Sequence, residues 1–210
     1  MLDLVLAGGG MMLPIIIASV IAMAIIFERL YTLRRSRVMG GDPVGTVQSW
    51  LGHGGLTQAR LSQLARLSPL GQILAAGLAG SHSAEEMRTR IEDAGRHVAH
   101  QMERYLNTLG TIALITPLLG LLGTVIGIID VFQAITSNSS GGMVPPELLA
   151  GGIAKALVTT AAGIMVAVPA FIFHRYFRGL IDELIIDMES DAIRLVDMLH
   201  PVDNARRRSA

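Results

Sequence analysis

The chain has 210 residues, of which 51% are hydrophobic, and its 17 Lys and Arg residues balance its 17 Asp and Glu residues. Zero net charge argues against a nucleic-acid partner, and a chain without cysteine has neither a disulfide framework nor a Cys-based metal site. The charges are unevenly distributed, because three runs carry none: Gly8–Phe27, Leu106–Ile129 and Ala156–Phe173. A membrane-spanning helix needs ~20 mostly apolar residues, so the sequence predicts an all-α membrane protein with three transmembrane helices.

Residues 1–35 are predicted to form an outward N-terminus and the first transmembrane helix, which we place at Met11 to Arg34. A cleaved signal peptide also contains an apolar run, but it has a basic start and a small-residue cleavage pattern. Here Asp3 is the only early charge, and no such pattern follows. We therefore expect a retained anchor.

Residues 36–105 are predicted to form a helical cytoplasmic segment. Gly40–Pro43 (GGDP) breaks the chain, because glycine and proline interrupt regular helices. After this break the apolar pattern predicts three short amphipathic helices. They cover Val44–Trp50, Leu56–Leu67 and Leu70–Ala79.

A longer helix is predicted after Ser83–Glu86 (SAEE), which has the pattern of a helix-capping box. No strong breaker follows before Pro117, and that proline lies inside the second apolar run. We therefore predict one continuous helix from Ala84 to Ala134. Its first half is expected in the cytoplasm and its second half in the membrane.

Three side chains of that helix have a spacing that can hold a metal ion. His97, His100 and Glu103 each lie three residues apart. No second cluster in the sequence completes such a site. We expect a solvated or subunit-facing surface there, with no metal and no cofactor.

Residues 106–178 are predicted to form a transmembrane hairpin, with the polar segment Thr136–Gly142 as its outer turn. Pro146 and Glu147 favour a helix start, since proline suits the first turn and an acid suits the positive end of the helix dipole. The third transmembrane helix is expected to begin there and to bend at Pro169.

Residues 179–210 are predicted to continue this helix into the cytoplasm as far as Leu199, followed by a basic tail. Apolar residues recur on one face of the continuation, which must pack on the preceding long helix or on another subunit. The stripe consists of Ile181, Leu184, Ile185, Met188, Ala192, Leu195 and Leu199.

Basic residues indicate the orientation of the three spans. Arginines follow the first and third spans, whereas the N-terminus and Ala134–Gly151 contain no Arg or Lys. Basic residues favour the cytoplasmic side of a membrane. We therefore expect an outward N-terminus, a cytoplasmic middle segment and a cytoplasmic C-terminus.

We single out four polar side chains of the predicted hairpin: Thr124, Thr160, Asp130 and Lys155. Antiparallel helices would place the two threonines at similar depth, and the two charges further outward, again at similar depth. Threonine hydroxyls often bond only to their own helix, and Lys155 can reach the headgroups while Asp130 faces water. The alternative hypothesis is an ion pair between Asp130 and Lys155 across the two helices, within or between subunits.

Small residues are abundant in the second and third spans, and such residues let helices pack closely in lipid. Packing on several sides is what a homo-oligomeric ring requires. The residues that we expect to shape these contacts are Gly120, Gly123, Gly127, Gly163, Pro117 and Pro169.

Three stretches resemble the ExbB and TolQ members of the MotA/TolQ/ExbB proton-channel family: Glu103–Ala113 (ERYLNTLGTIA), Pro117–Val125 (PLLGLLGTV) and Gly152–Ala170 (GIAKALVTTAAGIMVAVPA). The resemblance implies a homopentamer in a bacterial inner membrane, with a periplasmic N-terminus. Its pore would hold helices of an ExbD/TolR-like single-span partner that carries an essential aspartate. Proton flow would move this partner, and the work would pass to a TonB- or TolA-like protein. The resemblance also implies that Thr124 and Thr160 line the pore.

Lys155 departs from that pattern, because ExbB and TolQ typically have a glutamate there. Asp130 departs as well, since those proteins often have a neutral residue at this position. The two changes look linked, and an Asp130–Lys155 pair would lie near the outer mouth of the pore. The titrating carboxylate is then expected on the partner.

The function expected from the sequence is proton-driven force generation without enzymatic chemistry, for energised outer-membrane transport or envelope maintenance. ExbB and TolQ share the quoted motifs, so the motifs do not distinguish outer-membrane transport from envelope maintenance. A non-conducting scaffold of an envelope complex is an alternative, but it does not need the threonine pair. A flagellar stator-like subunit is another, and four spans would be expected for it.

Overall fold

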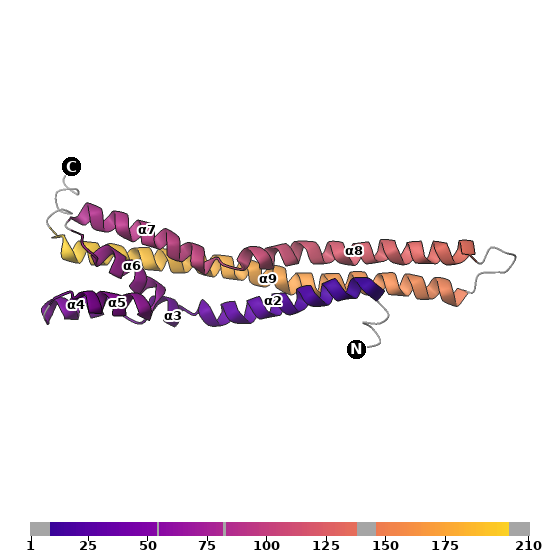
Figure 1. Cartoon of the computed structure of the whole chain (residues 1–210), viewed down its shortest axis with the longest axis horizontal. Coiled ribbons are helices and arrows are strands. Elements are labelled where there is room, and N and C mark those ends of the chain that lie inside the picture. The colour runs from indigo at the N-terminus through magenta and orange to yellow at the C-terminus, as the bar shows by residue number, and fades with distance from the viewer. Residues whose placement is uncertain (1–8, 54, 82, 138–145, 202–210) are drawn as a thin grey trace. The chain divides into compact units, whose positions relative to one another are not determined.

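The structure is a computed structural model, and it describes residues 9–53, 55–81, 83–137 and 146–201. Every element in these residues is helical (Figure 1). The elements in chain order are η1 (Gly9–Met11), α2 (Met12–Thr32), α3 (Arg35–Met39), α4 (Pro43–Gly52), α5 (Gln58–Leu67), α6 (Pro69–Leu78), α7 (Ala84–Met102), α8 (Leu106–Ser137) and α9 (Pro146–Leu199).

The chain forms two compact units. Unit 1 consists of Met1–Glu28 and Tyr105–Tyr176, and unit 2 consists of Arg29–Arg104 and Phe177–Ala210. Unit 1 therefore contains most of α2, the whole of α8 and the first part of α9. Unit 2 contains the shorter helices and the remainder of α9.

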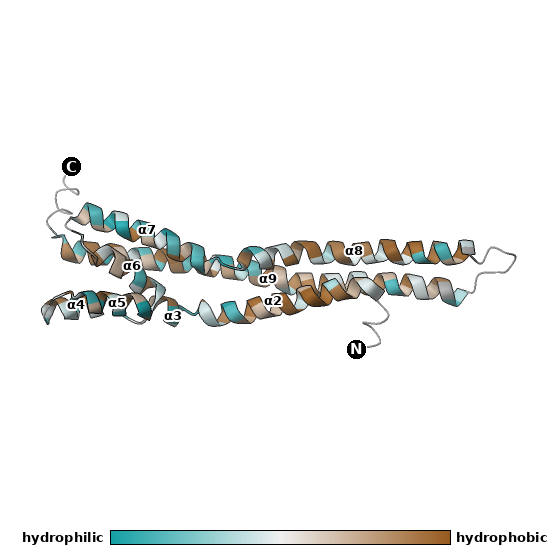
Figure 2. Ribbon diagram, in the orientation of Figure 1, coloured by the Kyte–Doolittle hydropathy of each residue, from teal (hydrophilic) through white to brown (hydrophobic). Residues whose placement is uncertain are grey.

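Three helical stretches are long and apolar enough to cross a membrane: Gly9–Thr32, Ala84–Thr136 and Leu149–Leu199. This confirms the three spans that the sequence predicts. Figure 2 shows apolar residues concentrated along α2, α8 and the first part of α9. Large apolar side chains there face outward, and Leu114 and Met165 are 72% and 73% exposed. Exposed apolar surface of this kind needs lipid or other helices around it.

The continuous helix predicted over Ala84–Ala134 is wrong at one place. The structure divides it into α7, which ends at Met102, and α8, which begins at Leu106. Tyr105 has a φ of 65°, a left-handed conformation that costs a non-glycine residue ~1–2 kcal/mol. The Nη1 atom of Arg29 donates a hydrogen bond of 2.9 Å to the Met102 carbonyl, which satisfies a carbonyl left without a partner at a helix end. Neither glycine nor proline marks this break, so breaker residues could not predict it.

Unit 2 has a core of large apolar side chains. The helical stripe predicted beyond the third span is buried in it, and five members are at most 2% exposed: Ile181, Leu184, Met188, Ala192 and Leu195. Residues of α6, α7 and α9 line one groove of about 560 Å³, so these three helices meet there. The stripe thus packs within its own chain, as one of the two predicted arrangements requires.

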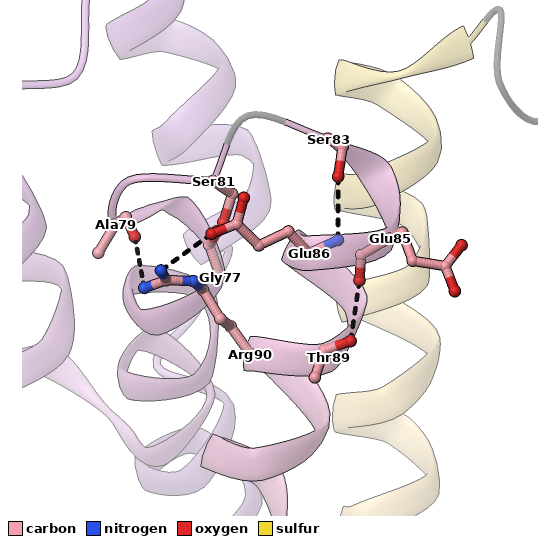
Figure 3. Close-up of polar contacts among 8 residues, drawn as sticks. All are labelled: Gly77, Ala79, Ser81, Ser83, Glu85, Glu86, Thr89 and Arg90. Carbon is pink, nitrogen blue, oxygen red and sulfur yellow. Dashed lines mark hydrogen bonds and ion pairs between the residues drawn. The ribbon is translucent and has the colours of Figure 1, made fainter.

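The connection between α6 and α7 is held by side-chain hydrogen bonds (Figure 3). Ser83 Oγ accepts the amide hydrogen of Glu86 at 3.2 Å, as the capping pattern predicts. The Glu86 carboxylate accepts from Arg90 at 3.0 Å, and Arg90 also donates to the Ala79 carbonyl at 3.0 Å. Arg90 therefore fastens the end of α6 to the first turns of α7.

The remaining helix predictions differ little from the structure. The three short predicted helices are α4, α5 and α6, each within two residues of its predicted ends. The third long helix runs from Pro146 to Leu199 as predicted, with Pro169 inside it. The short helix α3 was not predicted. Most of the predicted outer turn and the whole basic tail lie outside the described residues.

Candidate functional site

Two glycines let the backbones of α8 and α9 approach closely in unit 1, where these helices run side by side (Figure 1). A Cβ atom on Gly163 would lie 2.7 Å from the Thr116 carbonyl oxygen and 3.1 Å from the Gly120 Cα atom. A Cβ atom on Gly120 would lie 3.0 Å from the Cα atom of Thr160. These neighbours are backbone atoms that cannot move aside. We call this line of contact between α8 and α9 the seam.

The seam continues toward the end of α8 and the start of α9 through further small residues. A Cβ atom on Gly123 would lie 2.4 Å from the Thr159 Cγ2 atom, and one on Gly127 would lie 3.1 Å from the Ala156 Cβ atom. All four glycines named from the sequence therefore lie in the seam. The two prolines named with them stand inside α8 and α9, and both helices continue through them.

The structure brings Thr124 and Thr160 to one place on the seam. Thr160 Oγ1 donates a hydrogen bond of 3.0 Å across the helices to the Gly120 carbonyl. Thr124 Oγ1 donates one of 2.6 Å to the Leu121 carbonyl of its own helix. The two acceptors are consecutive carbonyls of α8, and both threonine side chains are half-buried. The Thr124 hydroxyl therefore bonds within its own helix, whereas the Thr160 hydroxyl bonds to the neighbouring helix.

Two further threonines of the seam were missed in the sequence. Thr116 and Thr159 are both 0% exposed, and each hydroxyl donates to a carbonyl four residues earlier in its own helix. Each lies four residues before a seam glycine, Gly120 and Gly163 respectively. Residues four apart share a helix face, so this spacing could have identified them.

Asp130 and Lys155 are also in contact. Lys155 Nζ lies 3.2 Å from an Asp130 carboxylate oxygen, with side chains 36% and 50% exposed. The pair joins α9 to α8 within one chain. Gly9, at a φ of +67°, lies against it, because a Cβ atom there would be 2.3 Å from Lys155 Cε. Three elements therefore meet around this ion pair.

The histidines with metal-like spacing do not form a cluster. His97 shares a hydrogen bond of 2.9 Å with the Gln101 amide on the surface of α7. No group of three metal-ligating side chains occurs within the part of the chain that the structure describes.

A tightly packed helical hairpin with hydroxyls and an ion pair inside apolar spans defines a polytopic α-helical membrane protein with an intramembrane polar site, a feature of channels and transporters. Residues 65–190 match the model of the MotA/TolQ/ExbB proton channel family. This chain belongs to that family, which confirms the resemblance inferred from its motifs.

Relatives with known names agree with this assignment. An ExbB-like biopolymer transport protein of Synechocystis sp. is 34% identical over 181 residues, which cover 86% of this chain and 71% of the relative. Biopolymer transport protein exbB1 of Vibrio cholerae serotype O1 is 33% identical over 168 residues, which cover 77% of this chain and 72% of the relative. Biopolymer transport protein ExbB of Salmonella typhimurium is 36% identical over 88 residues, 42% of this chain and 35% of that protein.

Proposed function

We propose that this chain is an inner-membrane proton-channel subunit that couples the proton motive force to work on a TonB- or TolA-type partner. Family membership and the ExbB-named relatives support a proton-channel role in biopolymer transport. One observation carries the proposal: Thr160 donates across the seam to the Gly120 carbonyl, next to the carbonyl that accepts from Thr124. Two half-buried threonines thereby bond to consecutive carbonyls of α8.

In the proposed mechanism, several copies, five by family resemblance, surround a pore lined by Thr124 and Thr160. The pore holds the spanning helices of an ExbD/TolR-like partner. An aspartate on a partner helix takes up and releases the proton. One charge crossing 100 mV releases about 2.3 kcal/mol. That energy is enough to bias a small rotation or tilt of the partner helix. In this proposal the N-termini of the ring lie in the periplasm.

The ion pair has a different role in this proposal. Asp130 and Lys155 lie outward of the threonines along both helices, and their contact at 3.2 Å neutralises both charges. We infer that the pair holds the wall of the outer pore mouth together and leaves proton uptake to the partner's carboxylate.

The threonine pair provides the decisive test. Thr160→Ala and Thr124→Val should abolish proton flux in proteoliposomes that contain the chain and the single-span protein with which it copurifies. Assembly, measured by native mass spectrometry, should be unchanged. Thr160→Ser should conduct, because it keeps the hydroxyl.

Thr136 supplies a matched control, since its hydroxyl bonds only within α8 and its side chain is exposed. Thr136→Val should conduct like the wild type. Normal flux in Thr160→Ala and Thr124→Val would contradict the proposal. A wild-type complex that assembles but carries no flux would favour the non-conducting scaffold.

A further inference from the structure

Four arginines follow the apolar run of the first span: Arg29, Arg34, Arg35 and Arg37. Two of them are held by other groups of the protein. Arg29 is 5% exposed and donates to the Met102 carbonyl at 2.9 Å. Arg35 Nη2 lies 2.9 Å from a carboxylate oxygen of Asp187 in α9. The positive charge of Arg35 is therefore offset by a carboxylate.

Arg34 and Arg37 are not offset in this way. Both residues are exposed, and the Arg37 amide donates to the Arg34 carbonyl at 2.8 Å, so they lie within one turn of each other. Among the residues that the structure describes, no carboxylate forms an ion pair with either guanidinium group. A guanidinium group has a fork of N–H donors that matches the oxygens of a phosphate. This turn of the chain therefore offers two uncompensated positive charges to an anion.

Tyr31, in the last turn of α2, holds the side chain of Arg37. The Arg37 guanidinium carbon lies 3.7 Å from the centre of the Tyr31 ring, which is a cation–π contact. Stacking on the face of the ring leaves the N–H groups at the guanidinium edge able to donate. Leu33 and Val38, which flank the arginines in the chain, are 2% and 1% exposed. The exposed arginines therefore stand on a segment that is anchored in the core of unit 2.

The apolar surface that precedes these arginines on α2 indicates a lipid. Phe27, Leu30 and Tyr31 are 62%, 40% and 56% exposed. Exposed apolar side chains at the end of a span need lipid around them, and tyrosine favours the level of the headgroups. A phospholipid along this end of α2 would therefore place its phosphate at the level of the arginines that follow.

We propose that Arg34 and Arg37 bind the phosphate of an anionic phospholipid whose acyl chains lie along the exposed face of α2. Two uncompensated positive charges favour a headgroup with a net negative charge, such as phosphatidylglycerol, over zwitterionic phosphatidylcholine. The four arginines then have separate roles, because Arg29 and Arg35 hold elements of the protein and the other two hold lipid. This inference does not depend on proton conduction or on another protein.

Lipid binding to the purified full-length chain tests the proposal. Phosphatidylglycerol or phosphatidylcholine is added in detergent, and the lipid that the protein retains is measured by native mass spectrometry. The wild type should retain phosphatidylglycerol in preference, and Arg34→Gln and Arg37→Gln should each weaken this binding about fivefold. Tyr31→Leu should weaken it about twofold, because Arg37 loses the ring beneath it. Tyr31→Phe keeps the ring and should bind like the wild type.

Two controls separate this site from the overall charge of the protein. Arg66→Gln removes one charge from an exposed position in α5, and Arg35→Gln combined with Asp187→Asn removes the neighbouring ion pair without changing the net charge. Both proteins should bind phosphatidylglycerol like the wild type. An equal loss of binding in Arg66→Gln would overturn the inference, because net charge alone would then explain the selectivity.

Two further results would overturn the inference directly. One is unchanged binding of phosphatidylglycerol in both Arg34→Gln and Arg37→Gln, and the other is equal retention of the two lipids by the wild type. Inorganic phosphate, added at the concentration of the lipid, should not displace phosphatidylglycerol. Displacement would assign the two arginines to a soluble phosphate and would overturn the assignment to a lipid.

Discussion

The two units of the chain differ in where many of their large apolar side chains lie. In unit 2 many of the buried side chains are large and apolar, and Leu64, Leu74 and Leu195 are 0% exposed. In unit 1 the contact between α8 and α9 is made by glycines and by threonines such as Thr116 and Thr159, while many large apolar side chains are exposed. Water drives apolar side chains together, whereas in lipid helices associate through close contact and hydrogen bonds. The place of the large apolar residues therefore indicates which solvent each unit meets.

Truncation of a large side chain should test this contrast most strongly. Leu195→Ala should destabilise the purified chain by about 2–5 kcal/mol, because it leaves a cavity in a packed core. Met165→Ala in unit 1 should have little effect, since that side chain is 73% exposed. Thermal unfolding in detergent measures both. A large loss in Met165→Ala would break the comparison, because it would place that side chain against a neighbouring subunit and not lipid.

Enlarging a seam glycine should have a smaller effect. Gly163→Ala should cost about 1–3 kcal/mol, as overpacking generally does, because the new Cβ atom would meet backbone of α8 at 2.7 Å. Gly151→Ala is the matched control on the same helix, since its Cβ atom would meet nothing within 4 Å. The same unfolding measurement applies. Equal stability of both variants would show that the seam is not closely packed.

Charge reversal at the ion pair should have the smallest effect on stability. Partly exposed ion pairs contribute roughly 0.2–1 kcal/mol, and the two side chains here are 36% and 50% exposed. Asp130→Lys and Lys155→Asp should each impair proton flux by placing like charges together, and the double variant should restore it. Flux in proteoliposomes is the measurement. A double variant as impaired as either single variant would argue against a functional pairing.

Much of the fold follows from patterns that the sequence displays. Uncharged runs of sufficient length predict the three spans, and the apolar stripe beyond Arg178 predicts burial of α9 in unit 2. The break before α8 could not be predicted, because Tyr105 takes up a left-handed conformation that its side chain does not favour. The small helix α3 was missed for a different reason, because five residues are too few to show a helical periodicity.

Reasoning from the sequence named four polar residues of the candidate site, but it missed Thr116 and Thr159 and did not give the acceptor of the Thr160 hydroxyl. In an antiparallel hairpin Thr124 lies at the depth of Thr160, and Asp130 at the depth of Lys155. Predicting these pairs needs only the lengths of the two helices. The acceptor of the Thr160 hydroxyl depends on how the two helices are rotated about their axes. That rotation is set by the seam glycines, and spacing within one helix does not determine the register between two.

The hydrogen bond from Arg29 to the Met102 carbonyl has a consequence for the order of synthesis. Its two ends lie 73 residues apart in the chain, and a ribosome that adds roughly 5–20 residues per second needs about 4–15 s to make that length. During this interval the Arg29 guanidinium has no Met102 carbonyl to which it can donate. Once Met102 has been made, the same side chain becomes buried structure. The bond at the break between α7 and α8 can therefore form only late in synthesis.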